Sequence, residues 1–213
     1  MSYQTETLKK WQEWLLNIQQ ELEELLLSRR MFNRYIEIVV GNPKIHEPSD
    51  FHDWTKTNYV SYAASTIRRQ LDFDDKDVIS IGRLLEQIKK SPNLLTKDWN
   101  RNHYPVRGPN IADANFKEFA GSGDHIDPKI IEEDINKLLK LGENIEKFAT
   151  RRIAHSSKKP IRKVTMTDLN IFIDELDRIL SKYILLFTGS QFDSSEPILQ
   201  YDWDSIFKEK WIL

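Results

Sequence analysis

The chain has 213 residues, of which 39% are hydrophobic and 30% are charged, and it contains no cysteine. This length suits one domain that buries a core without covalent cross-links, and the lack of cysteine excludes disulfides, thiolate nucleophiles and cysteine-based zinc sites. No uncharged apolar run is long enough to cross a membrane, and no signal peptide is readable at the start. We therefore expect a cytoplasmic protein without membrane contact.

The net charge of −2 is unevenly distributed. Six cations and no acidic residue lie between Arg151 and Lys163, which leaves a charge of −8 on the other 200 residues. A concentrated basic segment on an acidic body predicts a local binding site for phosphate. The alternative interpretation is a solvated helix end, where cations interact favourably with the helix dipole.

A regular apolar stripe opens the chain. Its members recur at spacings of three and four residues, and only Arg29 interrupts them: Leu8, Trp11, Leu15, Ile18, Leu22, Leu25, Phe32, Ile36 and Val39. This pattern predicts a long first helix that ends at Gly41, Asn42 and Pro43. The same stripe offers a seam through which two copies of the chain could form a purely structural dimer.

Two shorter helices are expected next. Asp50 is a candidate N-cap for the second helix, which we expect to turn Trp54 and Tyr62 toward the core. Residues 80–90 predict a third helix, which Ser91-Pro92 ends. Residues 91–126 are rich in Asn, Pro and Gly and predict a long loop excursion, with at most a short helix around its two phenylalanines.

Two long helices and a tail complete the chain. Asp127-Pro128 pairs an N-cap with proline at the first helical position and predicts a helix to about His155. The last long helix is expected from Thr167 to Gly189, followed by a C-terminal strap over residues 190–213 with a short docking helix marked by Trp203, Phe207 and Trp211. No alternating strand pattern appears, so we predict an all-α, up-and-down four-helix bundle forming a single domain over residues 1–213.

The basic segment also carries the candidate chemistry. Spacings of four and three residues from Leu141 through Ile145 predict that His155 shares the apolar face, with Arg151 four residues before it. One histidine and neighbouring arginines are the groups that metal-independent RNA cleavage needs, because a base must take the 2′-OH proton and cations must stabilise the phosphorane. The competing interpretation is a histidine at a helix end, hydrogen-bonded to backbone beside solvated cations.

Three sequence blocks, in order, resemble a known family over roughly residues 50–190. They are Ile67–Asp72 with Val78–Leu85, then Arg152–Ser156, then Thr167–Leu169 running to Phe187–Gly189. This order resembles the HEPN superfamily and, within it, the abortive-infection AbiU-like branch. The resemblance implies a four-helix bundle, usually dimeric, whose active members are metal-independent endoribonucleases of prokaryotic antiviral defence and toxin–antitoxin systems.

The resemblance also assigns roles. His155 would be the catalytic base, with Arg151 and Arg152 holding the scissile phosphate. Further phosphate contacts would come from six cations: Lys158, Lys159, Arg162, Lys163, Arg68 and Arg69. The family signature places four to six residues between its arginine and its histidine, whereas Arg151 leaves three. The alternative is therefore a non-catalytic helical scaffold that binds a protein partner or a nucleotide. The expected assembly is a homodimer that binds RNA or a nucleotide.

No metal or other cofactor is expected. His46 and His52 lie six residues apart with Asp50 and Asp53 between them. A metal site there is the weaker interpretation, because three well-placed ligands are usually needed.

Overall fold

A computed structural model describes residues 3–103, 109–155, 162–189 and 194–209. Its elements, in chain order, are α1 (Tyr3–Gly41), α2 (Asp50–Gln70), α3 (Ile81–Lys90), η1 (Pro92–Leu94), α4 (Lys97–His103), α5 (Pro109–Ala120), α6 (Pro128–Phe148), η2 (Ala149–Ala154), α7 (Met166–Thr188) and η3 (Trp203–Lys208). These described residues form no β-strand, apart from one isolated bridge between Thr96 and His125. The predicted all-α class is confirmed.

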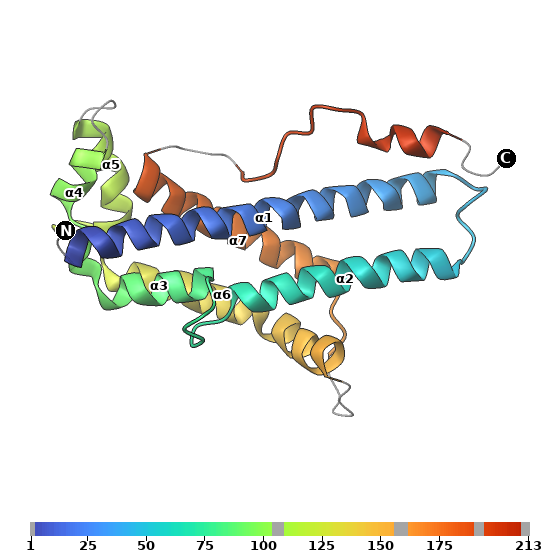
Figure 1. Cartoon of the computed structure of the whole chain (residues 1–213), viewed down its shortest axis with the longest axis horizontal. Coiled ribbons are helices and arrows are strands. Elements are labelled where there is room, and N and C mark those ends of the chain that lie inside the picture. Colours follow the sequence, from blue (N-terminus) through green and yellow to red (C-terminus); the bar gives the residue numbers. More distant parts are fainter. Residues whose placement is uncertain (1–2, 104–108, 156–161, 190–193, 210–213) are drawn as a thin grey trace.

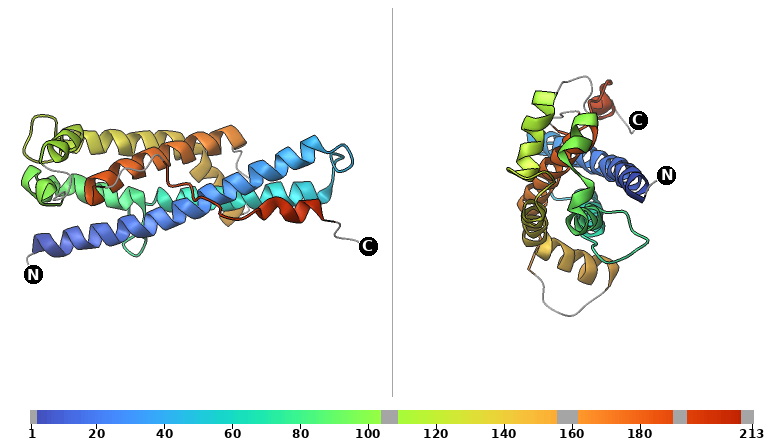
Figure 2. Two further views of the ribbon diagram at one scale, coloured as in Figure 1. Left: turned by 90° about the horizontal axis from the view of Figure 1, so that it is seen from above. Right: turned by 90° about the vertical axis from the view of Figure 1, so that its left-hand side faces the viewer.

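The bundle is built from α1, α2, α6 and α7, with α3 following α2 nearly end to end (Figures 1 and 2). α1 packs against α2, α3 and α7, and α6 packs against α2, α3 and α7. The short helices α4 and α5 cover one end of the bundle, and a strap, defined here as residues 194–209, runs along α1 toward the other end (Figure 1).

Side-chain caps explain where the helices begin. The hydroxyl of Ser49, one residue before the expected Asp50, accepts a hydrogen bond from the Phe51 amide at 3.2 Å and caps α2. Asp127 caps α6 ahead of Pro128 as predicted, and Thr165 with Asp168 forms a capping box at α7. α7 ends at Gly189 with φ of 69°, which glycine adopts without steric cost.

The apolar stripe of α1 is buried inside the chain. All its aliphatic and aromatic members lie in the core except Ile36, which is 38% exposed, while neighbouring Tyr35 is buried in its place. The Tyr35 ring lies against Phe51 and His52 of α2, so the buried face at this end of α1 is the one turned toward α2. Because α2, α3 and α7 already cover the stripe, it does not offer a free seam to a second copy.

Residues 91–126 are more ordered than the expected loop excursion. They form α4 and α5, which are held together by the buried Asn100 amide donating to the Ala112 carbonyl at 2.8 Å. Two parallel hydrogen bonds of 2.7 Å from Arg101 lower the pKa of Asp113 to about 2. Trp99 packs edge-on against Phe187 of α7, so this segment shares the main core. The frequent turn residues mark the boundaries of short helices here.

The far ends of α1 and α2 project beyond the other helices. Trp54 is 63% exposed and Tyr62 is 36% exposed, so the prediction that both face the core is wrong. No third long helix covers this end of the hairpin (Figure 1). The two aromatic rings instead line an apolar groove of about 760 Å³ that Trp203 and Phe207 of the strap also line. The predicted docking helix is present there as η3; Trp211 lies outside the described residues.

Candidate functional site: the cationic end of α6

The basic segment begins where α6 changes its winding. After Phe148 the chain continues as a π-helix, η2, and His155 leaves it in an extended conformation with φ −137° and ψ 136°. Such π-helical turns are rare and recur at functional sites. η2 packs beside α2 and projects from the side of the bundle opposite the strap (Figures 1 and 2).

This change of winding moves His155 off the apolar face. Ile145 is buried, but Arg152, Ile153, Ala154 and His155 are all exposed. The prediction that His155 faces inward with the α6 stripe is therefore wrong, because that prediction assumed an α-helical register as far as residue 155. In a π-helix each residue advances less around the axis, so side chains four apart no longer stack.

The cations near His155 differ in whether a carboxylate pairs with them. Arg151 is half-buried and Arg152 exposed, and neither has a carboxylate within salt-bridge distance among the described residues. Arg162 instead pairs with Asp168 at 3.2 Å. Hydrogen bonds from the Thr165 amide and hydroxyl are the main causes of the lowered pKa of Asp168, and Arg162 adds to it. The structure therefore leaves Arg151 and Arg152 available near His155 and uses Arg162 at the start of α7.

The remaining predicted phosphate ligands are scattered. Lys163 is exposed, and Lys158 and Lys159 lie outside the described residues. Arg69 pairs with Glu21 of α1 at 3.6 Å and belongs to the contact between α1 and α2. Arg68, beside it, is exposed. The predicted set is therefore only partly assembled by the fold.

The histidine pair near the start of α2 does not form a metal cluster in the described part of the chain. Nε2 of His52 lies 2.7 Å from the Ile45 carbonyl, and Nδ1 contacts the Tyr35 hydroxyl. Because a carbonyl only accepts, Nε2 donates and Nδ1 accepts from Tyr35. Both ring nitrogens of His52 therefore hold the connection between α1 and α2, and His46 is exposed.

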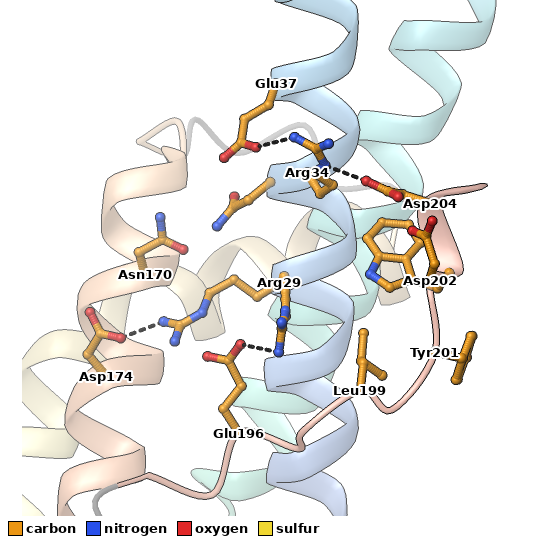
Figure 3. Close-up of a pocket in the computed structure, with 13 residues that line it drawn as sticks. Arg29, Arg34, Glu37, Asn170, Asp174, Glu196, Leu199, Tyr201, Asp202 and Asp204 are labelled. Carbon is orange, nitrogen blue, oxygen red and sulfur yellow. Dashed lines mark hydrogen bonds and ion pairs between the residues drawn. The ribbon is translucent and has the colours of Figure 1, made fainter. Parts of the chain in front are cut away.

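The structure also assembles a polar cleft that the sequence analysis missed. It measures about 640 Å³ and lies between α1, α7 and the strap (Figure 3). Arg29, Arg30 and Arg34 line it from α1, Asn170 and Asp174 line it from α7, and Glu196 and Asp204 reach it from the strap. The available signal was Arg29, the one position that breaks the apolar stripe of α1.

The fold and the α6 terminus define a class: an all-α bundle whose candidate chemistry rests on one histidine and neighbouring guanidinium groups. Comparison with protein families places the chain more specifically. The AbiU2 family of HEPN domains matches residues 8–205, so the chain belongs to this family. The resemblance stated from three short blocks is thereby confirmed over nearly the whole chain.

Other comparisons add nothing to this assignment. No curated protein and no solved structure matches the chain. Among the described residues, no helix is long and apolar enough to span a membrane.

Proposed function

We propose that this protein is an abortive-infection HEPN protein of prokaryotic antiviral defence that binds RNA at η2 and cleaves it with His155. The observation that carries the proposal is the exposed His155 beside Arg151 and Arg152, whose guanidinium groups are not engaged by carboxylates of the described residues. Unpaired guanidinium groups on a surface bind phosphate with charge-assisted, bidentate hydrogen bonds.

The proposed reaction needs no metal. The imidazole of His155 takes the proton of a ribose 2′-OH, and O2′ attacks the adjacent phosphorus as the bond to O5′ breaks. The products are a 2′,3′-cyclic phosphate and a free 5′-OH, whose proton comes from an imidazolium. Arg151 and Arg152 stabilise the charge of the phosphorane. His155 of a second copy supplies that acid in a homodimer, which exposure of the segment on the outside of the bundle permits.

A second candidate function is supported by a specific feature. Phe148, Ala149 and Thr150 occupy the positions where the family signature has its arginine, and none of them is basic. An AbiU-like chain with that departure fits a non-catalytic module that binds RNA, a nucleotide or a protein partner.

The decisive experiment compares His155→Ala with wild type in metal-free cleavage of a labelled single-stranded RNA. We expect the rate to fall about 10²–10⁴-fold, the usual contribution of a general base. His46→Ala is the control, because His46 is also exposed but lies in the connection between α1 and α2. Growth arrest on overexpression should be lost with His155→Ala and kept with His46→Ala. Cleavage that survives His155→Ala contradicts the catalytic assignment.

RNA binding is measured separately with Arg151→Gln/Arg152→Gln. We expect roughly tenfold weaker binding and a salt dependence reduced by about 0.7 for each lost phosphate contact. Lys129→Gln/Lys140→Gln is the charge-matched control, since both lysines are exposed on α6. Binding reduced by the arginine pair alone, without any cleavage by the wild type, selects the non-catalytic function. Equal effects of the two pairs contradict an RNA site at η2.

A further inference from the structure

The cleft between α1, α7 and the strap has no role in the proposed reaction. The strap that lines it runs on the side of the bundle opposite η2 (Figures 1 and 2). Three arginines on one stretch of α1 line the cleft and are called the arginine row here: Arg29, Arg30 and Arg34. Figure 3 shows Arg29 and Arg34 reaching the cleft from α1. Three guanidinium groups this close together repel one another unless anions lie between them. The three arginines are therefore stable side by side only when negatively charged groups lie between them.

In the described structure, carboxylates of the strap provide part of this negative charge. Asp204 accepts a hydrogen bond from Arg34 at 2.8 Å, and Glu196 lies 3.5 Å from Arg30. Arg30 also donates to the Pro197 carbonyl at 3.3 Å. From the bundle itself, Asp174 pairs with Arg29 at 2.5 Å and Glu37 pairs with Arg34 at 3.1 Å. Carboxylates of the strap thus occupy the positions where an outside anion would bind Arg30 and Arg34.

The charge of the cleft depends on the strap. Three arginines face five lining carboxylates, of which Glu196, Asp202 and Asp204 belong to the strap. Without those three, the cleft carries three positive charges against two negative ones. With the strap in place, the cleft is net negative and repels anions. When the strap is displaced, the cleft is net positive and attracts them.

The strap is held in a way that permits release. Its root is fixed, because Asp177 accepts hydrogen bonds from the Ser194 hydroxyl at 2.6 Å and from the Ser195 amide at 2.9 Å. Beyond the root, no residue of η3 is buried, and Ile198 is 87% exposed. The strap beyond its root is attached by Trp203 and Phe207, which line the apolar groove, and by ion pairs at the surface, which contribute about 0–1 kcal/mol each. A multivalent anion can replace the ion pairs.

The far wall of the cleft adds a second feature that suits a ligand. The Oδ1 atom of Asn170 on α7 is shielded from solvent, yet it has no hydrogen-bond partner among the described residues. A shielded polar atom without a partner costs free energy that a ligand with a hydrogen-bond donor would recover.

We infer that the arginine row Arg29, Arg30 and Arg34 is a phosphate-binding site, separate from the α6 terminus, and that the acidic strap is its displaceable cover. Its ligand is a phosphate-bearing molecule, either a nucleotide or a stretch of nucleic-acid backbone, which competes with Glu196 and Asp204 for the guanidinium groups. The strap thereby keeps the site closed until a sufficiently polyanionic ligand arrives.

The test uses the full chain carrying Arg151→Gln/Arg152→Gln, so that η2 contributes little to the measured ligand binding. The result can then be interpreted even if the proposed function at η2 is wrong. Glu196→Gln, Asp202→Asn and Asp204→Asn are added together. Binding of a fluorescein-labelled 12-nucleotide RNA is followed by anisotropy, and binding of ATP by calorimetry. We expect roughly tenfold tighter binding in at least one arm, with a salt dependence for RNA steeper by about 2 for three contacts. A gain with ATP identifies a nucleotide pocket, and a gain with RNA alone identifies a backbone site.

Two controls decide the outcome. Asp74→Asn/Asp75→Asn/Asp77→Asn removes the same charge from the exposed turn before α3 and should leave binding nearly unchanged. Adding Arg30→Gln/Arg34→Gln to the strap variant should abolish its gain. In the chain with its native strap, saturating ligand should speed amide hydrogen exchange in residues 198–208. Equal gains in the strap and turn variants, no gain with either probe, or exchange that ligand leaves unchanged would each overturn the inference.

Discussion

At the residue scale, Tyr59 shows how one buried group limits stability. Its ring stacks on Phe32 with centroids 4.3 Å apart, and it is only 7% exposed. Its hydroxyl oxygen is buried without a hydrogen-bond partner among the described residues, and burial raises the pKa of Tyr59 to about 12. A buried hydroxyl without a partner destabilises the folded state.

Replacing Tyr59 with phenylalanine should therefore raise the free energy of unfolding at pH 7 by up to about 1 kcal/mol. Tyr183→Phe is the matched control, because the Tyr183 hydroxyl donates to Asp134 at 3.0 Å and its loss should destabilise by roughly 1–3 kcal/mol. Urea unfolding followed by circular dichroism measures both changes. A Tyr59→Phe variant that is clearly less stable than wild type contradicts this account of the buried hydroxyl.

The same tyrosine predicts a dependence of stability on alkaline pH. The folded state keeps the phenol proton up to about pH 12, whereas the unfolded chain loses it near the ordinary pKa of 10.0. The unfolded state thus binds fewer protons in this window, so stability is complete below about pH 10 and falls as the pH rises toward 12. Tyr59→Phe should flatten this loss between pH 10 and 12. Burial also raises the pKa of Tyr183, so part of the slope should remain.

At the scale of the element, close approach fixes how α6 packs. A Cβ added at Gly142 would lie 2.2 Å from Cδ1 of Leu71 and 2.9 Å from Cε2 of Phe172. Only a glycine lets α6 lie this close to the end of α2 and to α7. The position of α6 in turn sets where η2, and with it His155, leaves the bundle.

Gly142→Ala should therefore destabilise the protein by roughly 1–3 kcal/mol through overpacking. Gly41→Ala is the control, since a Cβ there meets nothing within 4 Å at the end of α1 and should be neutral or slightly stabilising. Thermal melts of the two variants give the comparison. Equal melting temperatures would mean that Leu71 and Phe172 move aside without cost, which contradicts the tight packing.

At the scale of the whole molecule, the short helices and the long bundle share one core. Trp99 of α4 packs on Phe187, and Phe119 of α5 packs on Tyr183 with ring centroids 5.7 Å apart. We therefore propose that the described helices form a single domain. The strap, which lines the cleft with the arginine row, and η2 lie on opposite sides of the bundle (Figure 2).

A shared core predicts one cooperative unfolding transition, with a calorimetric enthalpy equal to the van't Hoff enthalpy. Hydrogen exchange should show α5 and α6 opening with the same free energy. The distal strap, residues 198–208, should exchange at much lower free energy because little of it is buried. An earlier transition confined to residues 92–126 would show that α4 and α5 form a separate unit.

The sequence by itself determined the helices, because periodic apolar residues and capping residues act locally. The end of α1 at Gly41, the Asp127-Pro128 start of α6 and the inward face of α7 could all be predicted from neighbours within one or two turns. The family could also be recognised from the Arg152–Ser156 block and its order among the others. Residues 91–126 misled this reasoning, since their turn residues separate two short helices that contacts with each other and with α7 stabilise.

Only the tertiary structure decided where the charged groups point and which of them meet. The π-helical winding of η2 moves His155 outward, and no side-chain periodicity reveals a change of winding in advance. The arginine row meets carboxylates that lie more than 140 residues away in the chain, such as Asp174 and Asp204. Such encounters depend on how the helices and the strap pack. A local sequence pattern therefore predicts an element and its buried face but not the partners of its exposed charges.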